Sequence, residues 1–308
     1  MDHLPIRIGT RGSPLALAQA HETRARLMAA LELPETAFEI VVISTQGDRV
    51  LDRPLSEIGG KGLFTREIED ALLAGQIDIA VHSLKDMPTE QPAGLVLDCF
   101  LPREDPRDAF VSHQFRSVAE LPEGAVVGSS SLRRVAQLKA VRPDLVTVPL
   151  RGNVGTRLKK LEAGEAVATF LAMAGLNRLA LAEVPKHPIE TDVLLPAVCQ
   201  GVITIERRVD DAVTAERLAQ IHHTETGQVV TCERAYLARL DGSCQTPIAG
   251  LARIEGDQIT LQGQILKPDG SESHSGEETG PIADAAAIGA RLAIRLLNAA
   301  GPDFLLAR

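Results

Sequence analysis

The chain has 308 residues, which at roughly 150 residues per domain predicts about two domains. Hydrophobic residues make up 44% and charged residues 24%, a globular mixture that excludes a disordered or fibrous chain. Lysine and arginine total 32 against 41 aspartate and glutamate, so the net charge is −9, and aromatic residues are only 3%. This composition lacks the basic face and the stacking surfaces of a nucleic-acid-binding protein.

The N-terminal segment and the cysteines favour a cytoplasmic protein with no membrane span and no metal. Arg7 and Arg11 interrupt the apolar stretch near the N-terminus, which argues against a secretory signal. No segment reaches the ~20 apolar residues of a membrane span. The four cysteines, at positions 99, 199, 232 and 244, show neither CxxC spacing nor paired histidine ligands, so we expect reduced thiols rather than a zinc site.

Strands and helices alternate through the first two thirds of the chain. Short apolar, β-branched runs predict strands at 6–9, 38–44, 77–83, 125–131 and 145–153, and a buried apolar segment at 166–175. Helices are expected at 15–31, 63–75, 131–141 and 154–164. Ser13 and Pro14 open the first of these, and Gly75 ends the second. Such alternation is typical of parallel sheets covered on both faces, and two lobes of this kind predict a cleft between them.

The last part of the chain has a different character. A helix is expected at 222–240, with His222 and His223 on its surface, followed by a Gly-rich turn. Residues 250–266 alternate as a strand pair that turns at Gly256-Asp257, and 281–301 form an amphipathic helix. These elements predict a small α+β third domain.

Basic side chains fall repeatedly where a strand ends or a helix begins. They are Arg11, Lys85, Arg133, Arg134, Arg151, Arg157 and Arg178. Guanidinium groups bind carboxylates or phosphates through paired hydrogen bonds, and helix N-termini favour anions, so this set predicts a cleft for a small polyanion. A P-loop is absent and GSSSLRR lacks the GxGxxG pattern, which favours carboxylates over phosphate. Alternatively, each cation is a solvated charge paired with the acidic excess.

Two further residues differ from their surroundings. Asp86 is a carboxylate among cations in HSLKDMP, where it suits a developing cation or a moving proton; the alternative is an ordinary ion pair with Lys85 or a nearby arginine. Cys244 lies in the small-residue turn DGSCQ, which favours an exposed sulfur that acts as a nucleophile or attachment point. The other cysteines lie in apolar or helical contexts, where a thiol is a small hydrophobic group.

Several stretches together resemble the porphobilinogen deaminase (hydroxymethylbilane synthase) family. In chain order they are IGTRGSPLALAQA, GGKGLFTREIE, DIAVHSLKDMP, REDPRDAF, GSSSLRR, RGNVGTRL, AMAGLNRL, LPAVCQG, HHTET and LDGSCQTPIAG. They run from near the N-terminus to about residue 250, so the resemblance covers most of the chain. It implies an α/β fold of three domains, the first two being hinged lobes that resemble type II periplasmic binding proteins. The implied boundaries are 1–101 with 202–219, 102–201, and a C-terminal α+β domain at 220–308.

The resemblance also implies an activity and a cofactor. The family condenses four porphobilinogen molecules into the linear tetrapyrrole hydroxymethylbilane, losing ammonia at each step. Its primer is a dipyrromethane cofactor held by a thioether to a loop cysteine, which corresponds to Cys244. Asp86 corresponds to the catalytic aspartate, which stabilises the azafulvene cation and handles protons at the pyrrole nitrogens. The family is generally monomeric, with no metal, nucleic-acid or membrane partner.

Binding residues carry over position by position. Cations and polar groups correspond to those that hold the acetate and propionate arms of the pyrroles, and Lys61 and Phe64 belong to a mobile loop. The implied binding set is Arg11, Ser13, Gln19, Lys61, Phe64, Ser83, Lys85, Ser129, Ser130, Ser131, Arg133, Arg134, Arg151, Asn153, Arg157, Arg178 and Gln200.

Departures and rival interpretations remain. Glu57, Val167, Cys199 and Ser243 differ from the family's usual residues. One rival is a two-lobed carboxylate-binding protein without catalysis, which needs neither Asp86 nor a linked cofactor and usually carries an export signal. Another is a Schiff-base enzyme that uses Lys85, although the adjacent Asp86 opposes the required fall in the lysine pKa.

Overall fold

The computed structural model describes residues 5–49, 64–240, 246–301 and 304–305. The chain divides into two compact units. The first comprises residues 1–104 and 202–227, and the second comprises residues 105–201 and 228–308.

The first unit is built on a five-stranded mixed sheet with the order β2-β1-β3-β10-β4. Its strands are β1 (Ile6–Thr10), β2 (Phe38–Val42), β3 (Ile79–Ser83), β4 (Leu95–Phe100) and β10 (Ile203–Arg208). β1 runs parallel to β2 and β3, whereas β10 runs antiparallel to both β3 and β4. The expectation of a purely parallel sheet is therefore wrong. The chain passes through most of the second unit before it returns as β10, and local alternation of strands and helices carries no signal for such a return.

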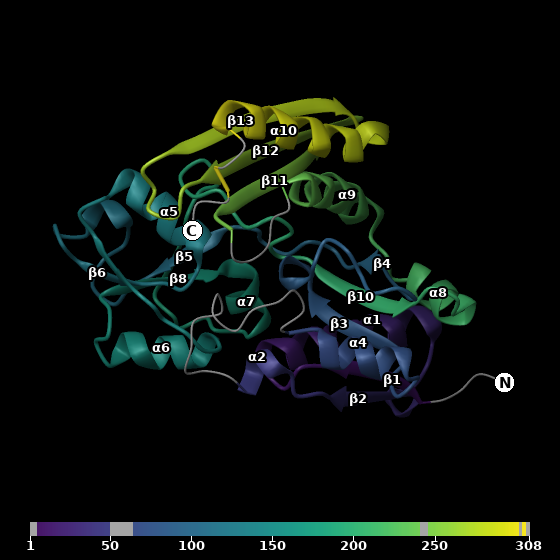
Figure 1. Ribbon diagram of the computed structural model, residues 1–308. Coiled ribbons are helices and arrows are strands. Elements are labelled where there is room, and N and C mark those ends of the chain that lie inside the picture. The colour runs from purple at the N-terminus through teal and green to yellow at the C-terminus, as the bar shows by residue number, and fades with distance from the viewer. Residues whose placement is uncertain (1–4, 50–63, 241–245, 302–303, 306–308) are drawn as a thin grey trace. The chain divides into compact units, whose positions relative to one another are not determined.

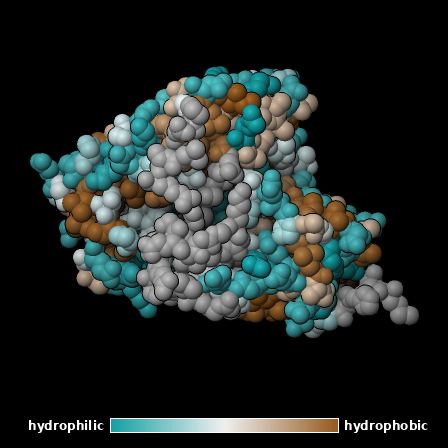
Figure 2. Space-filling view, viewed as in Figure 1, coloured by the Kyte–Doolittle hydropathy of each residue, from teal (hydrophilic) through white to brown (hydrophobic). Residues whose placement is uncertain are grey.

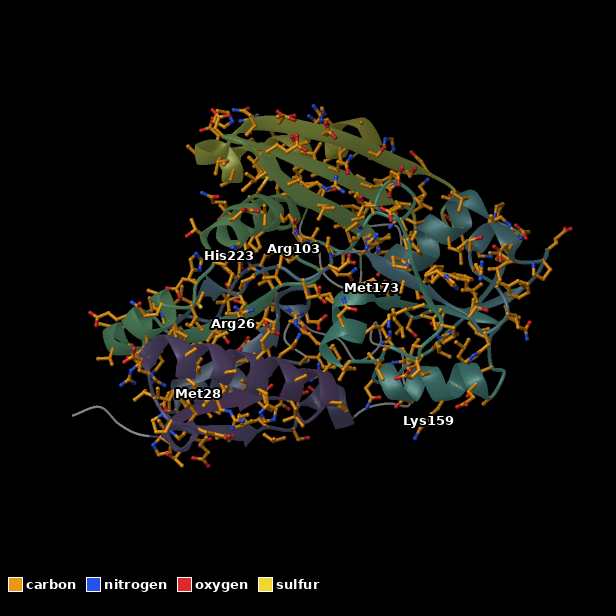
Figure 3. The ribbon with its side chains drawn as sticks, turned by 180° about the vertical axis from the view of Figure 1, so that it is seen from behind. Arg26, Met28, Arg103, Lys159, Met173 and His223 are labelled. Carbon is orange, nitrogen blue, oxygen red and sulfur yellow. The ribbon has the colours of Figure 1, made fainter. Side chains whose placement is uncertain are left out.

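Helices cover both faces of this sheet. α1 (Pro14–Leu31) and α8 (Ala212–Ala219) bury one face around Ile8, Leu27 and Leu218. α4 (Arg66–Leu73) buries the other face around Ile68 and Leu72. α4 lies toward the viewer in Figure 1, and α1 does so in the reversed view of Figure 3. A short helix, α2 (Gln46–Arg49), follows β2.

The second unit contains a sheet of the same plan, in the order β7-β6-β8-β5-β9. Its strands are β5 (Asp108–Val111), β6 (Val126–Gly128), β7 (Val146–Val148), β8 (Ala168–Ala172) and β9 (Lys186–Pro188). β6 is parallel to β7 and β8, and β5 is antiparallel to β8 and β9. Helices α5 (Leu132–Val141), α6 (Val154–Glu162) and α7 (Met173–Arg178) pack around it.

The C-terminal part of this unit is an antiparallel sheet in the order β11-β12-β13, packed against two helices. Its elements are β11 (Ile248–Glu255), β12 (Gln258–Leu266), β13 (Ser273–Pro281), α9 (Thr224–Arg239) and α10 (Ala285–Ala300). The predicted turn at Gly256 is confirmed, with φ of 64°. β13 was not predicted from SHSGEETGP, because this polar edge strand has alternating exposure but no apolar alternation. The α/β fold class with a small C-terminal α+β portion is confirmed.

The two helices of this part pack closely against each other at Gly289. A Cβ atom at this position would lie 2.1 Å from the Cys232 carbonyl oxygen of α9. Such a separation is far below van der Waals contact, so α10 can pack here only because residue 289 has no side chain.

Surface composition agrees with a folded acidic protein. Figure 2 shows polar residues spread over the face it presents, with apolar residues scattered between them. The exposed large apolar side chains, including Val42, Val141 and Val209, belong to separate segments. No helix in the described part of the chain is both long enough and apolar enough to span a membrane.

His222 and His223 were expected on the surface of the helix; His223 is exposed, but His222 is partly buried. Both precede α9, and the Nδ1 atom of His222 accepts a hydrogen bond from the Phe100 amide at 3.3 Å. The Nδ1 atom of His223 accepts from the Thr226 amide at 3.2 Å and so caps the first turn of α9.

We predict that Gly289→Ala lowers the free energy of unfolding by about 1–3 kcal/mol, because the new methyl group must push the two helices apart. Urea unfolding followed by circular dichroism measures the change. Gly155→Ala is the matched control, because Gly155 is exposed on α6 and its Cβ would meet only the Asn153 side chain, at 3.6 Å. Alanine there should be neutral or stabilising by up to about 1 kcal/mol. Equal effects at both positions would contradict the packing interpretation.

Candidate functional site

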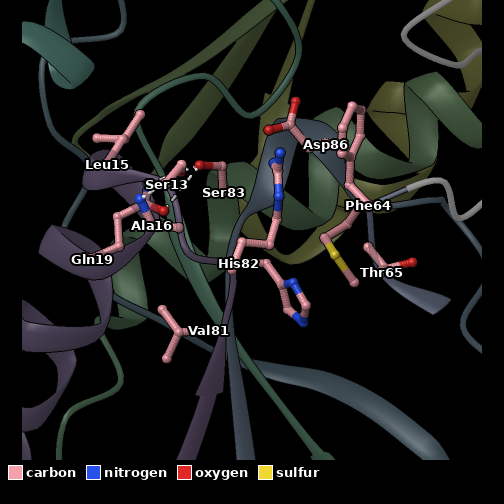
Figure 4. Close-up of a pocket in the computed structure, with 12 residues that line it drawn as sticks. Ser13, Leu15, Ala16, Gln19, Phe64, Thr65, Val81, His82, Ser83 and Asp86 are labelled. Atoms are coloured by element: carbon pink, nitrogen blue, oxygen red, sulfur yellow. Dashed lines mark hydrogen bonds between the residues drawn. The ribbon is translucent and has the colours of Figure 1, made fainter. Parts of the chain in front are cut away.

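A pocket in the first unit brings together six of the predicted site residues. They are Arg11, Ser13, Gln19, Phe64, Ser83 and Asp86. They come from the loop after β1, from α1 and its cap, from the residues before α4, and from the end of β3 and the turn after it. Figure 4 shows these segments converging on the pocket. Residues as far apart in the chain as Arg11 and Asp86 therefore line one pocket, as expected at the carboxyl ends of neighbouring parallel strands.

The wall formed by α1 is held by hydrogen bonds from two of these residues. The Ser13 hydroxyl accepts from the Ala16 amide at 3.2 Å and caps the helix, with Pro14 as its first residue. Further along α1, the side-chain amide of the buried Gln19 donates a hydrogen bond to the Ser83 hydroxyl at 2.8 Å. This bond fixes α1 against the end of β3.

Asp86 lies in a 3₁₀ turn, Leu84–Asp86, directly after β3. The turn is anchored by the buried Leu84, whose amide donates to the Val202 carbonyl at 3.0 Å. Lys85 belongs to the same turn but is not among the described residues that line the pocket. The Arg11 guanidinium stacks over the Phe64 ring, 4.3 Å from its centre, so a cation and a carboxylate occupy the same pocket.

Sequence analysis missed His82 and Thr65, which also line this pocket. His82 lies in HSLKDMP, and its place in the strand carries a usable signal. Residues two apart in a strand share a face, so His82 belongs with Ala80 on the face covered by α4.

The predicted arginine pair in the second unit is largely buried around one carboxylate. Asp108 of β5 is fully buried and lies 2.7 Å from Arg133 Nη2 and 2.6 Å from Arg134 Nη2. The Gln200 amide donates to Asp108 Oδ1 at 3.0 Å. Each arginine also donates a hydrogen bond to a main-chain carbonyl. Arg133 donates to the Leu195 carbonyl and Arg134 to the Phe170 carbonyl, each at 2.8 Å.

The charges of Asp108, Arg133 and Arg134 do not cancel. Burial raises the pKa of Asp108, but Arg133 and Arg134 outweigh burial and hold that pKa well below its usual value. Two guanidiniums against one carboxylate leave one buried positive charge. Arg133 Nε and Arg151 Nη1 are buried and have no hydrogen-bond partner among the described residues. Buried donors of this kind require an acceptor, so these positions suit an anionic ligand.

The remaining predicted residues of this unit have local partners. The Asn153 side chain accepts from the Thr156 amide at 2.9 Å and caps α6, and the Ser131 hydroxyl caps α5. Arg157 donates to the Gly152 carbonyl at 2.9 Å, and Arg178 donates to the Gly201 carbonyl at 3.1 Å.

The serines before α5 have unequal roles. Ser129 Oγ accepts from the Ser131 amide at 3.3 Å, and Ser130 is exposed. Their predicted binding roles stay predictions.

Two predicted site residues, Lys61 and Cys244, lie outside the described residues, as do Glu57 and Ser243. The other three cysteines are buried free thiols, as expected from their apolar contexts. Burial raises the pKa of Cys99 and of Cys232 to about 12, so neither thiol ionises near neutral pH.

The fold is that of a mixed α/β protein, and its first-unit pocket is lined by a guanidinium, hydroxyl groups and one carboxylate. Family models narrow this class to a transferase that carries a pyrrole cofactor. One, described as porphobilinogen deaminase, dipyromethane cofactor binding domain, matches residues 6–216, and a second, described as porphobilinogen deaminase, C-terminal domain, matches residues 228–298. The chain belongs to the porphobilinogen deaminase family.

A curated relative supports this assignment over nearly the whole chain. The porphobilinogen deaminase of Paracoccus denitrificans (strain Pd 1222) is 69% identical over 300 residues, which cover 97% of this chain and 96% of that protein.

The chain also aligns with solved periplasmic binding domains, at low sequence identity and low TM-score. The VFT2 domain of Bordetella pertussis BvgS aligns with 14% identity and a TM-score of 0.42, covering 70% of this chain and 86% of that domain. A probable amino-acid ABC transporter binding protein of Bacillus subtilis aligns with 11% identity and a TM-score of 0.41, covering 70% of this chain and 89% of that protein.

We predict that Asp108→Asn lowers the free energy of unfolding by about 3–5 kcal/mol, because it leaves two buried guanidiniums without a counter-charge. Asp105→Asn is the control: Asp105 is partly exposed and pairs with Arg107 near the surface, so its loss should cost about 1 kcal/mol or less. Urea unfolding at several pH values provides the measurement.

The pH dependence has a definite sign. Because the folded pKa of Asp108 is depressed, its stabilisation is present above the ordinary aspartate pKa of about 3.9 and declines as the pH falls below it. The difference between the wild type and Asp108→Asn should therefore narrow in acid. A difference that stays constant down to pH ~3 would contradict the assignment of an ionised Asp108.

Proposed function

We propose that this chain acts as a porphobilinogen deaminase whose chemistry takes place at the first-unit pocket. It condenses four porphobilinogen molecules into hydroxymethylbilane with loss of ammonia, on a dipyrromethane primer. The observation that carries the assignment of the site is the convergence of Asp86 with Arg11, Ser13 and Ser83 on one pocket. A carboxylate that lines the same pocket as cationic and hydroxyl donors suits a substrate that has carboxylate arms and reacts through a cation.

Asp86 is the catalytic residue in this proposal. Loss of ammonia from the aminomethyl group of porphobilinogen leaves a positive charge on the substrate, and a fixed carboxylate lowers the free energy of that cation. The same carboxylate accepts the proton released when the new carbon–carbon bond is complete. The short turn after β3 keeps Asp86 in place, since Leu84 is buried and tied to Val202.

Dipyrromethane, held by a thioether to Cys244, supplies the pyrrole carbon to which incoming substrate is joined. Its rings carry acetate and propionate arms, so the cofactor is a polyanion. The buried donors Arg133 Nε and Arg151 Nη1 match this chemistry, because each has room in its hydrogen-bonding capacity for a carboxylate oxygen. Arg134 contributes by neutralising Asp108, which leaves Arg133 as the excess cation.

Other predicted residues extend the same role. Lys61, Lys85, Arg157 and Arg178 add positive charge for later substrate units, and Phe64 holds the Arg11 guanidinium in the pocket. Polar groups complete the binding set: Ser13, Gln19, Ser83, Ser129, Ser130, Ser131, Asn153 and Gln200.

We also propose that the protein works as a cytoplasmic monomer that needs no metal, nucleic acid or membrane. Its net charge of −9 disfavours nucleic-acid binding. The three-domain division at 1–101 with 202–219, 102–201 and 220–308 belongs to this proposal. Its first domain follows the first compact unit apart from the boundary residues 102–104 and 220–227.

We predict that the intact mass of the purified chain exceeds the sequence mass by two porphobilinogen units less two ammonia molecules. Cys244→Ser should abolish this adduct, because serine oxygen is a far weaker nucleophile than a thiolate. In the unfolded wild-type protein, a thiol reagent should find the three free cysteines only.

Cys232→Ser provides the matched control. Cys232 is fully buried in α9, so its replacement should leave the adduct in place while removing one reactive thiol. An unmodified wild-type mass from cells that make porphobilinogen would refute the proposed function.

We predict that Asp86→Asn retains the cofactor adduct but lowers kcat for porphobilinogen by about 10²–10⁴-fold, because the amide neither neutralises a cation nor accepts the proton. Steady-state kinetics and the intact mass test this together. Asp98→Asn, which removes an exposed carboxylate of the same unit, should leave kcat within about twofold. Near-normal turnover by Asp86→Asn would remove Asp86 from the mechanism.

A further inference from the structure

A buried glutamine of α5 lies next to the arginine that has an unsatisfied donor. Gln137 follows Arg133 at an i,i+4 spacing, so the two side chains project from the same face of the helix. Gln137 is only 7% exposed and Arg133 only 5%. Gln137 lies outside the motif GSSSLRR and outside the binding set that the family resemblance implies, so its burial needs another explanation.

Gln137 makes paired hydrogen bonds with the backbone of one residue, Leu195. Its side-chain oxygen accepts from the Leu195 amide at 2.8 Å, and its side-chain nitrogen donates to the Leu195 carbonyl at 3.0 Å. Residues 191–200 form neither helix nor strand, so the glutamine supplies the pairing that a neighbouring strand would otherwise give. Gln137 therefore fixes the direction in which the Leu195 carbonyl points.

The same carbonyl holds the Arg133 guanidinium. Arg133 Nη1 donates to it at 2.8 Å, and Arg133 Nη2 lies 2.7 Å from Asp108 Oδ2. A carbonyl oxygen has two lone pairs, so the donors of Gln137 and Arg133 together fill the acceptor capacity of Leu195. Contacts at both Nη atoms fix the plane of the guanidinium, and they leave Nε as the donor without a partner among the described residues.

Arg134 shows the arrangement that Arg133 would otherwise favour. Its Nε and Nη2 atoms both donate to Asp108 Oδ1, at 3.1 and 2.6 Å, so its Nε is used within the protein. A buried donor without an acceptor raises the free energy of the fold, so Arg133 would gain by turning its own Nε toward the same carboxylate. The Leu195 carbonyl, held by Gln137, opposes this rotation because the rotation would break the bond from Arg133 Nη1.

We propose that Gln137 is a positioning residue that keeps the Nε donor of Arg133 available to a carboxylate arm of the cofactor. It acts through the Leu195 carbonyl rather than by touching the cofactor or the substrate. A carboxylate that accepts from a fixed donor is held in one place, and small displacements of a reacting group lower the rate by large factors. The inference rests on the proposed function, in which Arg133 binds the cofactor.

Nuclear magnetic resonance of the arginine Nε–H groups in the cofactor-loaded enzyme tests the orientation without turnover. Gln137→Met removes both hydrogen bonds to Leu195 while keeping a similar volume and a good helix former. It should shift and broaden the Nε–H signal of Arg133, because that guanidinium loses its fixed acceptor. The Nε–H signal of Arg134 is the internal reference and should stay in place, because its Nε donates to Asp108 and not to Leu195.

Two features make this variant informative about position rather than folding. The carbonyl of Pro196, next to Leu195, accepts from the Gly250 amide at 3.0 Å, so the segment stays attached when Gln137 is replaced. Gln137→Asn is the second variant: its amide is one methylene shorter and does not reach both backbone groups of Leu195. It should shift the same Arg133 signal, and it decides if Gln137→Met does not fold.

Steady-state kinetics measure the functional effect. Per mole of cofactor-loaded chain, counted by intact mass, Gln137→Met should lower kcat about tenfold and leave KM for porphobilinogen within about twofold. The split is expected because the pocket that we propose for the substrate is lined by residues of the first unit, whereas Gln137 belongs to the second.

Arg142→Met is the matched control. Arg142 lies at the other end of α5 and also donates to main-chain carbonyls, those of Val118 and Leu121, each at 3.0 Å. Its replacement removes support from the same helix but should leave kcat within about twofold and both Nε–H signals in place.

Three results would overturn the inference: an unshifted Arg133 signal in Gln137→Met, equal shifts of the Arg133 and Arg134 signals, or a kcat no lower than that of Arg142→Met. Absence of the cofactor adduct or of turnover in the wild type would instead refute the proposed function. The comparison of the two Nε–H signals does not depend on turnover, so it would then still decide whether Gln137 sets the orientation of Arg133.

Discussion

Charged side chains removed from water need partners, and this constraint organises the interior next to each five-stranded sheet. In the second unit, the buried Asp108 is contacted by the guanidinium groups of Arg133 and Arg134 and by the side-chain amide of Gln200. In the first, Glu206 and Glu69 gather around His82. The Asp108 group ties α5 to β5, an antiparallel strand of its sheet. In the first unit, the His82–Glu206 contact joins β3 to the antiparallel strand β10. The placement of strands that return from elsewhere in the chain and the placement of charge therefore depend on each other.

Sequence patterns predicted the elements whose signals are local. Ser13 and Pro14 predict the start of α1, and an apolar run predicts β3. The turn residues Gly256 and Asp257 predict the β11–β12 pair. β5 and β10 were not predicted as antiparallel members, because their neighbours are distant in sequence and their pairing has no periodic signature. β5 begins in REDPRDAF, whose charged and proline residues show no strand pattern, and Asp108 in it is fully buried.

The candidate site, like the fold, was predictable where the signal is local in the sequence and not where it depends on distant residues. Motifs identified Arg11, Ser83 and Asp86 by type and position, and the structure places all three on one pocket. What motifs could not supply was the partner of each group. Arg134 donates hydrogen bonds to the buried Asp108, and the Asn153 side chain caps α6. Residues that the motifs predict alike as ligand-binding groups therefore differ in how many further hydrogen bonds they can make to a ligand.

The average charge of the chain therefore says little about the charge that a ligand meets. The net charge is −9, yet the group of Asp108, Arg133 and Arg134 has one more cation than anion. Arg133 and Arg151 also have buried donors for which the described part of the chain supplies no acceptor. Such donors lower the stability of the folded protein when nothing accepts from them. A polyanion that accepts from them binds only the folded chain, so it restores that stability as it binds. Under the proposed function, the incomplete hydrogen bonding that weakens this interior is therefore also the feature that favours a ligand with carboxylates.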